Sequence, residues 1–138
     1  MRLAPRLHSS ALALLCAAGL CFAGCGRDDD ARAAGLVSER FVRAVAADDG
    51  DAACAQLSPD TARTLERDEG EPCAEAARGL PIAASAVRRA QVFGVSAKVD
   101  FAGGDSAFLE LTPSGWKVAA AGCRPVAREQ PYECELEA

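Results

Sequence analysis

Histidine and asparagine are nearly missing from this sequence, which contains one histidine, His8, and no asparagine. Serine and cysteine nucleophiles usually depend on a histidine base, and imidazole is the commonest protein ligand of transition metals. A catalytic or metal site that needs a histidine side chain could therefore use only His8. The lack of asparagine excludes N-linked glycosylation, and no Walker A pattern or dinucleotide-binding glycine pattern occurs.

Lysine is also scarce, since Lys98 and Lys117 are the only two lysines. The 138 residues include 20 acidic and 15 basic side chains, which gives a formal net charge of −5. An acidic surface does not attract nucleic acid or anionic lipid headgroups. We therefore expect no nucleic acid partner and no polybasic contact with a membrane.

The N-terminal segment has the layout of a secretory signal peptide. Arg2 and Arg6 precede an apolar run of 12 residues, Ala11–Phe22, and small residues follow it. The run is much shorter than the roughly 20 residues that a membrane-spanning helix needs. We expect residues 1–24 to be cleaved, and His8 is lost with them.

The segment ends in Phe22-Ala23-Gly24-Cys25, which resembles a bacterial lipobox with Phe22 where leucine is usual. The resemblance implies cleavage before Cys25, lipidation of that cysteine, and anchoring at the extracytoplasmic face of the cell membrane. One acyl chain binds a membrane only marginally, so stable anchoring needs two or more chains.

Cleavage would leave 114 residues, with 13 basic and 20 acidic side chains and a net charge of −7. This length is enough for one compact domain, which we place at residues 34–138. Residues 25–33 contain Asp28-Asp29-Asp30 and are expected to form a solvated acidic tether. No rigid element fixes these carboxylates as metal ligands.

Four cysteines lie in the predicted domain, at Cys54, Cys73, Cys123 and Cys134. An even number of cysteines in a small exported domain predicts two disulfides, for which three connectivities exist. We favour Cys54–Cys73 and Cys123–Cys134, because each pair brackets one supersecondary unit. A four-cysteine zinc site is the competing interpretation, but neither pair has the two-to-four-residue spacing of zinc ribbons.

Helices are predicted in the first half of the domain. The apolar period favours a helix over residues 34–48 with Phe41 on its buried face. Gly50 is suited to end this helix, and Asp51 is suited to cap a short helix that follows. Further helix boundaries are indicated by Ser58-Pro59 at a start, Gly70 at an end, Pro72-Cys73 at a start and Gly79 at an end.

Strands are predicted from residue 87 onward, where the apolar period changes to two. The expected strands cover about 87–93, 95–101, 107–111, 116–120 and 132–136, with turns at 102–105 and 112–115. Gly94 is expected to mark a bulge. Trp116, Val118 and Ala120 are expected on one buried face, and Phe108 on the opposite face. Helices followed by antiparallel strands predict an α+β domain, with the helices on one face of a curved sheet.

This order resembles the cone-shaped nuclear transport factor 2-like superfamily. The matching segments are the opening helix at 41–45, the acidic break at 48–51 and the strand Gly115-Trp116-Lys117-Val118. Small bacterial envelope lipoproteins of this superfamily pair helical cysteines and C-terminal cysteines in a similar way. The resemblance covers about residues 34–138 and implies a curved sheet with a concave face.

The predicted domain offers no set of catalytic residues and no metal site. Asp100, Ser96 and Lys98 alternate with apolar residues, so we expect them in solvent, where a lysine is not activated by desolvation. Residues 48–51 lack the alternate acids of a calcium loop. Arg88-Arg89 is expected to be a solvated strand edge.

A ligand pocket is the remaining small-molecule hypothesis. Cone folds often leave the concave face hollow, and its expected lining here is Trp116, Phe101, Leu109 and Tyr132. Filling of the core is the competing role for Trp116. We interpret the protein as a non-enzymatic envelope module that binds a protein partner or a small ligand, without a cofactor. The alternatives are an acid-dependent enzyme of the cone fold and a subunit that docks on a membrane complex.

Overall fold

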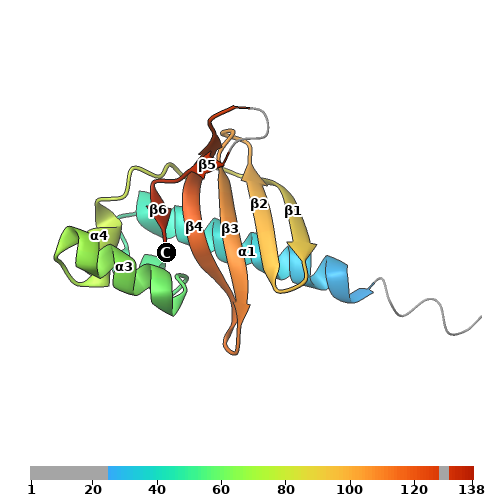
Figure 1. The fold of residues 1–138 in the computed structure, drawn as a ribbon, viewed down its shortest axis with the longest axis horizontal. Helices are drawn as coiled ribbons and strands as arrows, with labels where there is room; N and C mark the ends of the chain where they lie inside the picture. The colour runs from blue at the N-terminus through green and yellow to red at the C-terminus, as the bar shows by residue number, and fades with distance from the viewer. Residues whose placement is uncertain (1–24, 128–130) are drawn as a thin grey trace, which may run out of the picture.

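The computed structural model describes residues 25–127 and 131–138 (Figure 1). The signal peptide predicted at 1–24 therefore lies outside the described residues. In the described part of the chain the helices are α1 (Cys25–Ala46), α2 (Gly50–Cys54), α3 (Pro59–Glu69) and α4 (Cys73–Arg78). The strands are β1 (Val87–Phe93), β2 (Ser96–Phe101), β3 (Ser106–Thr112), β4 (Gly115–Pro125), β5 (Tyr132–Glu133) and β6 (Leu136–Glu137). The predicted α+β class is confirmed.

Helix α1 begins at Cys25, well before the predicted start at residue 34. Residues 26–33, expected as a solvated tether, are continuous with this helix. Asp28 lies in its first turn, where a negative charge favours the helix dipole, and Asp29 pairs with Arg32 at 2.9 Å. The alanines that follow are strong helix formers. Favourable charges and high helix propensity together extend α1 to the N-terminal side of residue 34.

The short helices follow the predicted boundaries with two corrections. Gly50 does not end the first helix, because α1 ends at Ala46 and Gly50 is the first residue of α2. Asp49, not Asp51, caps α2, because its side chain accepts a hydrogen bond from the Ala52 amide. Ser58 caps α3 as predicted, with Pro59 in the first turn and Gly70 at the end. Helix α4 ends at Gly79 as predicted.

The strands form an antiparallel meander in the order β1-β2-β3-β4, with β5 and β6 both paired to β4. Gly94 lies in the tight turn between β1 and β2 at a φ of 64°, a conformation that glycine adopts without strain. It does not form the predicted bulge. The bulge of β1 lies between Val87 and Arg89 instead.

Strand β4 changes its buried face along its length. Trp116 and Val118 are buried as predicted, but Ala120 is only half-buried, and Ala121 is buried in its place. The register of β3 and β4 shifts twice, and Ala121 and Gly122 together oppose the single residue Ala107. Gly122 has a φ of 66°, as in bulges that require a left-handed residue. The other shift leaves Ala119 without a partner between Val118 and Ala120, and this extra residue moves Ala120 off the buried face on which the alternation predicted it.

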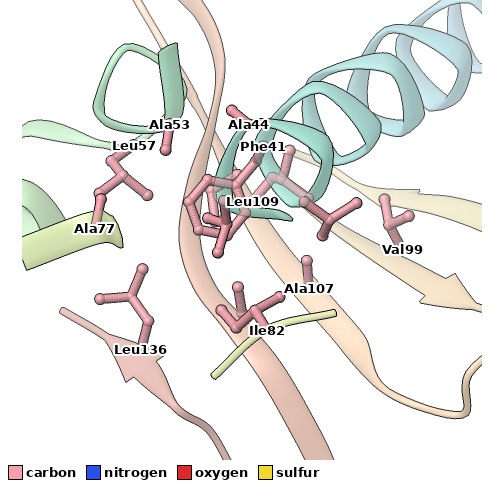
Figure 2. Close-up of a cluster of buried hydrophobic side chains, with 14 of the residues drawn as sticks. Phe41, Ala44, Ala53, Leu57, Ala77, Ile82, Val99, Ala107, Leu109 and Leu136 are labelled. Carbon is pink, nitrogen blue, oxygen red and sulfur yellow. The ribbon is translucent and has the colours of Figure 1, made fainter. Parts of the chain in front are cut away.

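Helix α1 packs along one face of the sheet, and the other helices lie beside β4 (Figure 1). The core between the layers centres on Phe41 from α1 and Leu109 from β3 (Figure 2). Ile82, Leu136 and Leu57 close the core beside β4, and each is at most 6% exposed. The sheet is not closed into a barrel in the described residues.

Candidate functional site

The face of the sheet opposite α1 is not crossed by a helix in the described part of the chain (Figure 1). We call it the open face. The strand register sets its side chains in three rows, which are Phe93–Ser96–Glu110–Lys117, Gln91–Lys98–Phe108–Ala120 and Arg89–Asp100–Ser106–Cys123. The residues between them in β2 and β3, such as Val99 and Leu109, are buried toward the helices. This period-two alternation assigns the two faces.

Three polar groups form a connected cluster on the open face. Lys98 Nζ lies 2.8 Å from Asp100 Oδ1, and the Ser106 hydroxyl donates a 2.7 Å hydrogen bond to the same oxygen. The side chains of Lys98 and Asp100 are 24% and 15% exposed, so this ion pair is screened less than a surface pair. Ser106 is buried, and sequence alternation alone did not identify it. The signal that identifies Ser106 is the predicted turn at 102–105, because a hairpin closed by this turn places Ser106 opposite Asp100.

An aromatic pair lies beside this cluster. The Phe108 and Tyr132 rings meet edge to face with their centroids 5.1 Å apart, and Lys98 Nζ lies 5.1 Å from the Tyr132 centroid. This arrangement combines an aromatic contact with a cation–π contact. Tyr132 belongs to β5, which pairs with the end of β4, so the C-terminal segment covers one end of the open face.

The electrostatics of the cluster favour charged, paired side chains. Hydrogen bonding to Asp100 is the main cause that raises the pKa of Lys98, so this lysine remains protonated at neutral pH. Burial opposes ionisation of Asp100, but hydrogen bonds from Lys98 and Ser106 outweigh it, and the pKa of Asp100 falls below its ordinary value of 3.8. A protonated lysine cannot act as a base, and a stabilised carboxylate is a weak one. The pKa values of Lys98 and Asp100 are thus moved in the directions opposite to those that would make either group a better base.

Replacing Asp100 with asparagine is expected to reduce the pH dependence of stability. Because the folded pKa is lowered, the stabilising contribution of Asp100 is present above pH 3.8 and is lost as the pH falls through the folded pKa. We expect Asp100→Asn to cost about 1 to 2 kcal/mol at pH 7 and to lose less stability than the wild type on acidification. Urea unfolding at several pH values measures this. Asp60→Asn, at an exposed pair on α3, is the control, and equal pH profiles for Asp100→Asn and wild type would contradict the prediction.

The residues predicted to line one pocket do not come together. Phe101, Leu109 and Trp116 are each at most 5% exposed and pack in the core between sheet and helices. Tyr132 lies on the open face, on the other side of the sheet. The C-terminal segment reaches that face because β5 pairs with β4 beyond the bulges. The helix-facing side of the sheet is therefore filled at these residues.

Both favoured disulfides are present. Cys54–Cys73 and Cys123–Cys134 have Cα–Cα distances of 6.0 and 3.9 Å, and they span 19 and 11 positions of the chain. The first joins α2 to α4, and the second fastens the C-terminal segment to β4. No group of three or more histidine, cysteine, aspartate or glutamate side chains in the described ranges could hold a metal ion. The side chain of Cys25 lies outside what is described.

A shallow hollow of about 430 Å³ lies where α1 ends and α2 begins. Its polar lining comes from Arg40, Arg43, Asp49 and Gln56. Arg43 pairs with Glu39 at 2.7 Å, and the Asp49 carboxylate caps α2, so two of these groups already have partners. The hollow is therefore a weaker candidate than the open face.

No protein-family model matches the chain, and neither a curated protein nor a solved structure matches it. Among residues 25–127 and 131–138, no helix is both long enough and apolar enough to cross a membrane. The fold and the site define a two-layer α+β domain with two disulfides, in which no helix of the described residues covers one face of the sheet.

Proposed function

We propose that this protein is a lipid-anchored module of the bacterial cell envelope, held at the extracytoplasmic face of the membrane, that binds a partner without catalysing a reaction. The lipobox-like Phe22-Ala23-Gly24-Cys25 supports the anchor. The two disulfides support an oxidising compartment, since such bonds persist outside the cytoplasm.

The open face is the observation that carries the binding role. It combines the exposed Phe93, the half-buried Phe108–Tyr132 pair and the Lys98–Asp100 ion pair on one rigid sheet. Aromatic side chains with fixed polar neighbours are typical of protein-binding surfaces. A protein partner is favoured over a small ligand, because the predicted pocket residues are packed in the core.

The alternative of an acid-dependent enzyme required a buried carboxyl group with a raised pKa. Asp100, the carboxyl group most involved in the open face, has a lowered pKa instead. The enzyme hypothesis therefore gains no support from this residue.

Kinship with the nuclear transport factor 2-like superfamily is also proposed. The order of helices before an antiparallel meander supports it, as does the position of the helical and C-terminal cysteine pairs. The sheet differs from a full cone in that β5 and β6 are two-residue strands that add only to β4.

Native mass spectrometry of the protein extracted gently from its own membrane tests the proposal. We expect a mass that starts at Cys25, carries two or more acyl chains, and lacks four hydrogens because of the two disulfides. A Cys25→Ala variant should lack the acyl chains and leave the membrane fraction. A stoichiometric protein partner supports the binding role, and a copurifying small molecule favours the ligand alternative. An unacylated mass that starts at Met1 contradicts the anchor.

A further inference from the structure

The two edges of the sheet differ in how far other segments of the described chain pair with them. Along β4 the edge is covered at three places, since β5 pairs with Arg124 and Pro125, and β6 pairs with Ala120 and Ala121. The segment 56–58 covers the third place, where the Val118 amide donates to the Gln56 carbonyl at 2.9 Å and the Ser58 amide donates to the Val118 carbonyl at 2.9 Å. In the described part of the chain, β1 pairs with β2 alone.

The free edge of β1 carries unpaired backbone groups. Just past one end of β2 the Ala102 amide donates to the Ala86 carbonyl, and just before the other end the Leu111 amide donates to the Val95 carbonyl. Since these bonds alternate along a strand, the even-numbered residues of β2 bond to β1 through their backbone and the odd-numbered residues bond to β3. Because hydrogen-bonded and non-bonded pairs alternate, Ala90 and Val92, which oppose odd-numbered residues, direct their amide and carbonyl groups outward. Such a row of donors and acceptors is a template for an added strand.

The side chains beside this edge have two distinct characters. On the helix side Val87, Ala90 and Val92 are only half-buried, whereas inward residues of β2 such as Ala97 and Val99 are at most 2% exposed. The first turns of α1 extend past β1, on the helix side of the free edge of the sheet (Figure 1). An added strand would therefore cover apolar surface on its helix-facing side.

On the side of the open face the edge is basic, although the chain as a whole is acidic. Arg88 and Arg89 are exposed, and the bulge sets both of them opposite Asp100. Asp100 already pairs with Lys98, and Arg88 adds only a weaker electrostatic effect on the pKa of Asp100. Neither Arg88 nor Arg89 forms a direct ion pair with another described residue. Positive side chains on an edge strand often do no more than keep that edge solvated. Here, however, the arginines lie beside outward-pointing backbone groups and apolar residues that are only half-buried.

We infer that β1 accepts an extended segment of a partner protein as an additional antiparallel or parallel strand, and that this segment alternates acidic and apolar residues. Its acidic side chains meet Arg88 and Arg89, and its apolar side chains cover Val87, Ala90 and Val92. This mode is β-strand addition, in which backbone hydrogen bonds give affinity and alternate side chains give specificity. The inference rests on the proposed partner-binding function and names the surface and the chemistry of the partner.

The test uses the full-length protein purified in detergent and two fluorescent peptides, one alternating Glu and Val and one alternating Lys and Val. We expect the acidic peptide to bind and to slow amide hydrogen exchange at Ala90 and Val92. Arg88→Glu with Arg89→Glu should weaken the acidic peptide on the order of tenfold and strengthen the basic one. Arg63→Glu with Arg67→Glu, at exposed arginines of α3, is the matched control and should change neither.

Val92→Pro separates strand addition from simple charge attraction. Proline removes an outward amide and leaves the β2 hydrogen bonds of β1 intact, so the fold should persist, which Trp116 fluorescence checks, while peptide binding is lost. Each of the following results would overturn the inference: binding retained by Val92→Pro, no binding of the acidic peptide at about 1 mM, binding without protection of Ala90 and Val92, or protection of these amides by a second copy of the chain. If a copurifying partner cross-links to Phe108 but not to β1, the inference fails while the proposed function stands.

Discussion

Gly50→Ala is expected to lower the free energy of unfolding by about 3 kcal/mol or more. A Cβ atom at this position would overlap the Ala74 carbonyl oxygen and lie 2.6 Å from its carbonyl carbon. Both atoms belong to the backbone of α4, which cannot rotate away as a side chain can. Helix α2 would have to separate from α4. Urea unfolding followed by Trp116 fluorescence measures the change.

Gly79→Ala is the matched control for this prediction. A Cβ at Gly79 meets only the Ala76 carbonyl oxygen at 3.6 Å, which is ordinary van der Waals contact. Its stability should stay within about 1 kcal/mol of the wild type, with a gain possible from the stiffer unfolded chain. Equal stabilities for Gly50→Ala and Gly79→Ala would show that α2 and α4 do not approach as closely as described.

Removing the Cys54–Cys73 bridge is expected to cost about 3 kcal/mol in the chain-entropy model. The bridge spans 19 positions, and its loss frees the unfolded chain between α2 and α4. The variant Cys54→Ala with Cys73→Ala avoids new polar groups at two half-buried positions. Its urea midpoint should fall well below that of the wild type under oxidising conditions.

The comparison variant for this bridge is Cys123→Ala with Cys134→Ala, which opens the shorter loop of 11 positions. Its loss should be smaller by a few tenths of a kcal/mol in the same model. A Cys54→Ala, Cys73→Ala variant within about 1 kcal/mol of the wild type would refute the entropic role. Adding Gly50→Ala to this variant should cost less than the sum of the two effects, because both act on the α2–α4 contact.

Local signals predicted much of the fold correctly. Ser58-Pro59 and Gly70 mark α3 because capping chemistry acts over only a few residues. The disulfide pairing followed from the units that each pair brackets. The tether predicted at residues 25–33 is wrong, because Asp28-Asp29-Asp30 lies in the first turns of a long helix, where negative charge is favourable.

Features that depend on long-range contacts do not follow from local sequence patterns. A period of two assigns faces only while the pleat is unbroken, and the extra residue Ala119 in β4 moves Ala120 off the predicted face. Tyr132 in β5 lies against Phe108 on the open face, and not with the core residues predicted beside it. The Asp100–Ser106 contact can be predicted only when the register of the β2–β3 hairpin is known. The cover of the β4 edge by residues 56–58 joins segments about 60 positions apart, which no local pattern reports.

The disulfide connectivity also has a consequence for how the chain matures. Each cysteine of the domain is bonded to its nearest cysteine along the chain, Cys54 to Cys73 and Cys123 to Cys134. A polypeptide that emerges N-terminus first from an export channel presents Cys73 to Cys54 before either of the later thiols appears. If the chain is exported as proposed, the native pairs are the first that the four cysteines of the domain can form among themselves, so the order of emergence favours the native connectivity. For an exported chain with this connectivity we expect an oxidant to suffice for the two bonds, without an isomerase to reshuffle them.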